Sequence, residues 1–211
     1  MVEQENPPQI GGGKLIIESG YPKDKANFIR QRLKMLNEKF GFYPDVELVA
    51  KDVLLGGTKG SQVAVNYADE NKIRIGTKYA TIKLHDGYAI DHEYGHFFDV
   101  RAEPDLKAAK NMVKLNPNNE YFKNKLLQKQ KELDAYKNSP HLAKWQRLDA
   151  IYKGLKKEVP KGLHPYQFTN LGEFAAEVFA GHLYGAKHGS NQKLYDEAYN
   201  IIVSLPKKKV K

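Results

Sequence analysis

The sequence contains no cysteine among its 211 residues. Disulfide bonds and thiolate metal ligands are therefore excluded, and only His, Asp or Glu could hold a transition metal. There is also no apolar run approaching the roughly 18 residues that a membrane span requires. The opening MVEQENPPQIGGG is polar, acidic and rich in Pro and Gly. It predicts an irregular start and contains no signal-peptide pattern.

The overall composition is typical of a soluble globular protein, with 41% hydrophobic and 28% charged residues. The length allows one substantial domain or two small lobes that share a cleft. The net charge of +9 is concentrated in residues 101–161, which hold 15 Lys and Arg against 7 Asp and Glu. This segment indicates either a solvated helical face or a surface that attracts an acidic protein, a membrane surface or nucleic acid.

The first hundred residues predict a small sheet and one long helix. Pro22 suits the first turn of a helix, and Gly41 ends its apolar periodicity. Two segments of alternating apolar and polar residues, separated by a polar turn, predict a hairpin. A glycine-rich loop at 56–60 precedes it. The expected strands are residues 14–19, 46–55, 62–68 and 72–77.

The second half of the sequence predicts helices. Residues 103–158 are almost wholly helical in pattern, with a break at 138–140. A loop then runs to Asn170, and helices are expected at 171–184 and 191–204. We expect the basic tail after residue 205 to be frayed.

One predicted helix carries the pattern His-Glu-x-x-His, formed by His92, Glu93 and His96. Residues four apart lie on one face of a helix, so the two imidazoles can bind a single ion. Glu93 lies beside that face and can take a proton from a zinc-activated water. Gly95 inside this apolar helix costs about 1 kcal/mol relative to Ala, which indicates a closely packed neighbour. The alternative is a chance occurrence of the pattern.

A catalytic zinc site needs a third protein ligand and an open position. One zincin subclass places Gly and His where this chain has Asp99 and Ala102, so that subclass is excluded. The best candidate is Glu173, on a helix whose residues 174–180 are apolar except for Glu177. Two carboxylates one turn apart in a buried helix need a cation and hydrogen-bond donors. We therefore expect zinc at Glu173 and the ring N–H of a ligand His at Glu177.

Two ordinary roles remain open for these glutamates. Glu173 follows Asn170 by three residues, which is the spacing of a capping box, so its side chain could simply bond to the start of its own helix. Glu177 could instead form a buried pair with a lysine.

The segments HEYGHFFD (92–99) and YQFTNLGEFAAEVF (166–179) resemble the catalytic domain of anthrax lethal factor and its relatives, which include the bacterial Pro-Pro endopeptidases. These proteins are glutamate-type zincins. The segment SGYPKDKANFIRQRLKML (19–36), between two expected strands, is also similar to the Pro-Pro endopeptidases. The resemblance covers most of the chain outside about 101–160.

The resemblance implies roles for particular residues. It makes His92, His96 and Glu173 the zinc ligands and Glu93 the general base and acid. It makes Tyr166 the hydroxyl that stabilises the oxyanion. It makes Glu177 the partner of a ligand His. Asp99 would orient its own helix or a His.

The resemblance also implies a fold. We expect an α+β, zincin-like chain with a small mixed sheet and the active-site helix in residues 1–100, and a mainly helical lobe in residues 162–211. The 77 residues from His96 to Glu173 exceed what the family leads us to expect. Residues 101–161 are therefore predicted to be a basic helical insertion in a single catalytic domain.

The expected function is a zinc-dependent endopeptidase acting on a protein or peptide substrate, with a possible preference for Pro-containing sequences. By resemblance it is secreted or delivered, although cytoplasmic location stays open. We expect a monomer without stable membrane insertion or a nucleic-acid partner. The alternative is a catalytically silent zincin scaffold whose basic helices hold an anionic partner, and the intact Glu93 disfavours it.

Overall fold

The computed structural model describes residues 2–5, 13–50, 64–67, 72–76, 87–159 and 166–208. The chain divides into two compact units, which are described separately. The first comprises Met1–Asp99 and Pro165–Lys211, and the second comprises Val100–His164. The class is α+β and mostly helical, as expected, with seven α-helices among the described residues. None of these helices is both long and apolar enough to cross a membrane.

The first unit contains a mixed sheet whose described strands have the order β1-β2-β3-β5-β4. The strands β2, β3 and β5 are parallel, while β1 and β4 pair antiparallel with β2 and β5 at the two edges. The pairing of β4 with β5 confirms the expected hairpin. The strands are β1 (Val2–Glu5), β2 (Leu15–Glu18), β3 (Asp45–Leu48), β4 (Ala64–Tyr67) and β5 (Lys72–Ile75).

Three sequence-based expectations about this sheet and the chain ends are wrong. The opening is not wholly irregular, because Val2–Glu5 form an edge strand on β2. The strand expected at 46–55 ends at Leu48, where the backbone N–H of Ala50 donates to the side chain of Glu18 at 2.9 Å instead of to a strand. Residues 51–55 and the glycine loop 56–60 lie outside the described residues. The described part of the tail, residues 206–208, is not frayed, since Lys207 pairs with Phe98 in an antiparallel β-bridge, whereas residues 209–211 lie outside the described residues.

Helix α1 (Lys23–Phe40) covers the sheet with an apolar stripe of Ile29, Leu33 and Leu36, which are all buried. It ends at Gly41, where φ is +64° and the backbone N–H donates to the carbonyl of Asn37 at 2.7 Å. Only glycine adopts such a left-handed cap without strain. The predicted limits of this helix are thus confirmed.

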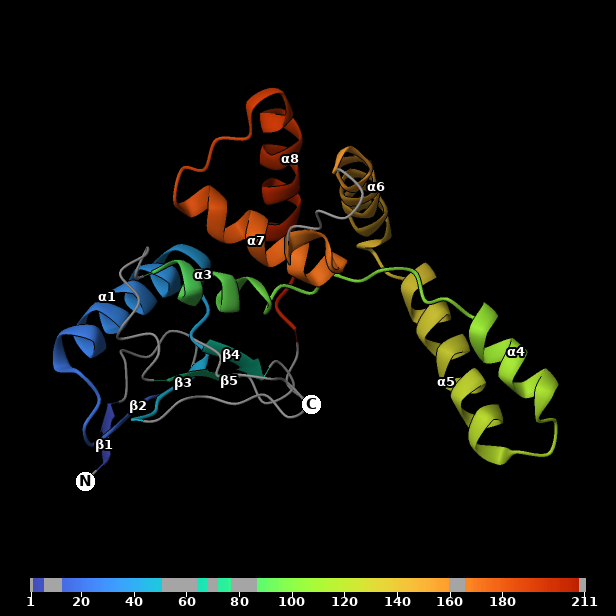
Figure 1. Cartoon of the computed structure of the whole chain (residues 1–211), viewed down its shortest axis with the longest axis horizontal. Helices are drawn as coiled ribbons and strands as arrows, with labels where there is room; N and C mark the ends of the chain where they lie inside the picture. Colours follow the sequence, from blue (N-terminus) through green and yellow to red (C-terminus); the bar gives the residue numbers. More distant parts are fainter. Residues whose placement is uncertain are drawn as a thin grey trace. The chain divides into compact units, whose positions relative to one another are not determined.

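Two helices far apart in the sequence pack against each other in this unit. Helix α3 (Tyr88–Gly95) lies between the sheet and α7 (Leu171–Leu183), and contacts β4 on the sheet side (Figure 1). Helix α8 (Gln192–Val203) packs on α7. This arrangement brings residues 92–96 beside residues 173–177.

Gly95 is the point of closest approach of these two helices. A Cβ added there would lie 2.9 Å from the Cα of Ala176 and 3.3 Å from the Cβ of Phe179. Any larger residue would push α7 away from α3. The close neighbour expected from the unfavourable glycine is therefore present.

The second unit is helical throughout its secondary structure, as predicted. Its helices are α4 (Lys107–Leu115), α5 (Glu120–Lys137) and α6 (Leu142–Glu158). The break expected at 138–140 separates α5 from α6. Across it, the rings of Tyr136 and Trp145 stack with centroids 5.4 Å apart.

Candidate metal centre

Helix α3 presents His92 and His96 one turn apart. Their Nε2 atoms lie 3.2 Å from each other, and the two rings are nearly perpendicular, at 86°. His92 is buried, with 10% of its side chain exposed, and His96 is 17% exposed. The i, i+4 spacing thus turns two ring nitrogens toward one point, as the sequence predicted.

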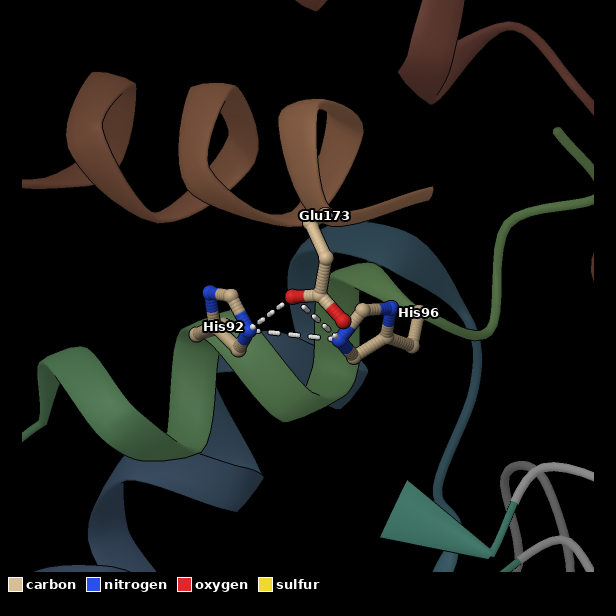
Figure 2. A group of neighbouring side chains, drawn as sticks. All are labelled: His92, His96 and Glu173. Carbon is tan, nitrogen blue, oxygen red and sulfur yellow. Dashed lines mark hydrogen bonds and ion pairs between the residues drawn. The ribbon is translucent and has the colours of Figure 1, made fainter. Parts of the chain in front are cut away.

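Helix α7 supplies the third group from its first turn. Oε2 of Glu173 lies 3.2 Å from Nε2 of His92 and 3.6 Å from Nε2 of His96. Figure 2 shows the carboxylate of Glu173 reaching from α7 to the two imidazoles. Asn170 caps the helix by accepting a hydrogen bond from the backbone N–H of Glu173 at 2.9 Å. This bond is one half of a capping box, while Oε2 of the Glu173 side chain faces the two imidazoles.

These three residues form a group that could hold a metal ion, since one ligand atom from each lies within 4.8 Å of the others. Oε2 of Glu173 is buried and accepts no hydrogen bond from the described part of the chain. A buried carboxylate oxygen without a donor is costly unless a cation meets it. The donor set of two imidazoles and one carboxylate therefore fits a metal ion.

Glu177, one turn further along α7, lies behind His92. Its Oε1 is 3.1 Å from Nδ1 of His92, an ion-pair contact that does not meet the directional geometry of a hydrogen bond. Its Oε2 accepts a hydrogen bond from the hydroxyl of Tyr88. Within the described residues, no lysine forms an ion pair with Glu177. The expected contact with a ligand histidine is present.

Tyr88 was not among the residues expected at this centre, although its spacing from His92 is a local signal. Tyr88 precedes His92 by four residues, so it lies on the same face of α3 and meets the same carboxylate of α7. Burial and the hydrogen bond to Glu177 raise the pKa of Tyr88, so its hydroxyl stays protonated and remains a donor.

A second missed contact anchors α3 to α1. Asp91, which is fully buried, forms an ion pair with Arg32 through two hydrogen bonds, of which the one from Nε to Oδ1 is 2.9 Å long. A two-pronged Arg–carboxylate contact fixes orientation as well as distance. This ion pair fixes α3 to α1 at the residue immediately before His92.

The other predicted residues lie as follows. Tyr166 lies in a short 3-10 turn before α7, with its ring centroid 5.9 Å from that of His92. The charge of Glu93 acts on both His92 and Tyr166. Asp99 follows α3, and its backbone N–H donates to the carbonyl of Pro206 at 2.8 Å. The predicted roles of all three side chains stay predictions.

One proton is shared unequally between the histidines. Burial opposes a charge on His92, but the carboxylates of Glu173 and Glu177 outweigh it and raise the pKa of His92 to about 9. Burial and the positive charge of His92 lower the pKa of His96 to about 4. The surrounding charges therefore favour a proton on His92 and disfavour one on His96.

A metal ion must displace that proton, because only a neutral imidazole can coordinate it. We expect the apparent affinity for a divalent ion to rise about tenfold per pH unit from pH 6 until pH passes the pKa of His92, about 9. With an ordinary histidine pKa of 6.5, the rise in affinity would end about 2.5 pH units earlier. Competition with a chelator of known affinity measures this dependence.

The control is Glu177→Gln, which removes one carboxylate that raises the pKa of His92. In this variant the rise should level off at a lower pH than in the wild-type protein. An affinity that does not change between pH 7 and pH 9 in the wild-type protein would contradict the assignment of the proton to His92.

The chain matches no model of a known protein family, no curated protein and no solved structure, so its function is inferred from the residues that meet at this centre.

Proposed function

We propose that this protein is a zinc-dependent endopeptidase whose zinc ligands are His92, His96 and Glu173. The observation that carries the proposal is the mutual spacing of their donor atoms, which is 3.2, 3.2 and 3.6 Å. Tetrahedral ligands about 2.0–2.2 Å from a zinc ion lie roughly 3.3–3.6 Å from one another. The three atoms are thus already spaced for zinc without movement of either helix.

The chemistry of the ligands also favours zinc. Two histidines and one glutamate form a known catalytic zinc set, and three protein ligands leave one position open. When bound, the ion supplies Lewis acidity, which makes water acidic enough to ionise near neutral pH and polarises a substrate carbonyl. Glu177 and Tyr88 provide the outer contacts that such histidines require.

The remaining roles belong to Glu93 and Tyr166. Glu93, which adjoins His92, takes a proton from the attacking water and delivers it to the leaving amine. Tyr166 donates its hydroxyl to the oxygen that becomes negative in the transition state. Partial enclosure of the Tyr166 hydroxyl and the nearby carboxylate of Glu173 raise the pKa of Tyr166, which keeps that hydroxyl protonated. Its side chain is 60% exposed, so a substrate can reach it.

The edge of the sheet offers a place for the substrate backbone. Of the two hairpin strands, β5 is paired on both sides, whereas β4 is at the edge of the described sheet and contacts α3. An extended peptide that adds to β4 as a further strand would pass beside the helix that carries His92 and His96. We also propose that the chain is zincin-like, that it prefers Pro-containing sequences, and that it is secreted or delivered.

The experiment begins with the zinc content of the purified protein, determined by elemental analysis, and with its cleavage of a mixed peptide library. We expect one zinc per chain and cleavage that stops when a chelator removes the metal and returns when zinc is restored. If the protein holds one zinc but cleaves no peptide, we would assign it instead as a binding module whose basic helices hold an anionic partner. Cleavage that survives complete removal of metal would overturn the proposal.

A further inference from the structure

Tyr88 makes a contact for which the proposed reaction has no direct use. Its hydroxyl donates a hydrogen bond to Oε2 of Glu177. The other oxygen of the same carboxylate, Oε1, lies 3.1 Å from Nδ1 of His92. One carboxylate of α7 therefore joins two side chains that lie one turn apart on α3.

The carboxylate of Glu177 needs an external contact to define its orientation. The terminal torsion of a glutamate side chain is broad, so its own rotamer does not fix where the two oxygens point. The side chain is 23% exposed, and water can compete for its oxygens. A hydrogen bond from Tyr88 to Oε2 removes this freedom and turns Oε1 toward His92.

Tyr88 is itself held in place from a second direction. Its ring packs against that of Tyr184, with centroids 5.6 Å apart. The guanidinium of Arg32 lies 5.2 Å from the centroid of the Tyr184 ring. Arg32 also pairs with buried Asp91 of α3. Tyr184 therefore contacts both the ring of Tyr88 and the arginine of this ion pair.

The orientation of Glu177 matters because a histidine binds metal through one nitrogen while the other nitrogen carries the proton. His92 turns Nε2 toward Glu173 and His96, and its buried Nδ1 toward Glu177. A carboxylate at Nδ1 keeps the proton on that nitrogen and leaves Nε2 unprotonated for the ion.

We propose that Tyr88 is a positioning residue of the metal centre, which acts through Glu177 to fix the tautomer and the ring orientation of His92. The inference rests on the metal site of the proposed function. Tyr88 itself contacts neither the ion nor the substrate.

The test is Tyr88→Phe, which removes one hydroxyl and keeps the ring that packs on Tyr184. We expect zinc affinity, measured by competition with a chelator, to fall about tenfold, because loss of outer contacts to ligand histidines typically weakens metal binding by 10–100-fold. In the zinc-loaded protein, the Nδ1 proton of His92 should also exchange faster with water, which NMR of the imidazole detects.

Tyr94→Phe is the matched control. Tyr94 lies on the same helix and is fully buried, but its hydroxyl donates to the backbone carbonyl of Phe42 at 2.8 Å, away from Glu177. This variant should lower thermal stability and leave zinc affinity unchanged. Equal losses of zinc affinity in the two variants would overturn the inference, since any lost hydroxyl of α3 would then have the same effect.

A double variant separates action through Glu177 from a direct effect. In a Glu177→Ala background, the additional change Tyr88→Phe should cost no further zinc affinity, because the residue through which Tyr88 acts is already gone. Losses that add in full would overturn the inference.

The outcomes also separate this inference from the proposed function. Wild-type protein that binds zinc but cleaves no peptide would overturn the peptidase and leave the Tyr88 result valid. Wild-type protein that binds zinc with an affinity unaffected by Tyr88→Phe would overturn only the positioning role. Wild-type protein that binds no metal would overturn both.

Discussion

Replacing Glu93 with Gln is expected to lower kcat for peptide hydrolysis by about 10²–10⁴-fold, which is the contribution of a positioned general base. Gln has almost the same shape as Glu but cannot accept a proton from water. Glu93 is not among the three residues that form the candidate metal group. The zinc content should therefore stay at one per chain while turnover is lost.

A matched Glu→Gln control is available on α1 of the same unit. Glu38 is 63% exposed and forms only a loose pair with Lys34, at 3.9 Å. Glu38→Gln should keep wild-type kcat and zinc content. If Glu93→Gln retained more than about a tenth of the wild-type kcat, its role as the base would be wrong, and the proton acceptor would have to be sought in another residue.

Replacing Glu173 with Ala is expected to abolish stoichiometric zinc binding, and peptide cleavage with it. The change removes one of three ligand atoms and leaves two imidazoles whose Nε2 atoms lie 3.2 Å apart. The start of α7 should survive, because Asn170 caps the helix through the backbone N–H of residue 173, which alanine retains. Elemental analysis and thermal unfolding together separate loss of metal from loss of structure.

Glu177→Ala is the control for that experiment. It removes a half-buried carboxylate from the same face of the same helix, but this carboxylate contacts Nδ1 of His92 instead of the point where the three donors meet. Zinc should still bind, with an affinity about 10–100-fold weaker. Full retention of zinc by Glu173→Ala would exclude Glu173 as a ligand, whatever the behaviour of Glu177→Ala.

The residues of the metal group could be recognised from the sequence because local helix geometry brings them together. His92 and His96 share a helix face through their spacing of four, and no distant contact is needed to predict it. Glu173 stood out because residues 174–180 are apolar except for Glu177, which makes two carboxylates one turn apart costly there without a cation. The helical character of residues 103–158 followed in the same way from local periodicity.

The contacts that orient this group could not be predicted from local patterns. Tyr88 meets Glu177, and Arg32 meets Asp91, across separations of 89 and 59 residues. Such partners depend on how closely α3 approaches α7 and α1, and Gly95 sets the first of these distances. The spacing of four residues places Tyr88 on the same helix face as His92, but no local pattern shows that this face meets Glu177.

The sheet shows the same division. Alternation of apolar residues was enough to locate β5, because this strand buries one face. It could not show that Val2–Glu5 would pair with β2, or that β4 would occupy the other edge. Strand order depends on hydrogen bonds between distant segments, and these form only when the helices have packed on the sheet. Spacing along one helix is a property of the sequence, whereas the meeting of α3, α7 and the edge strand depends on packing of the whole unit.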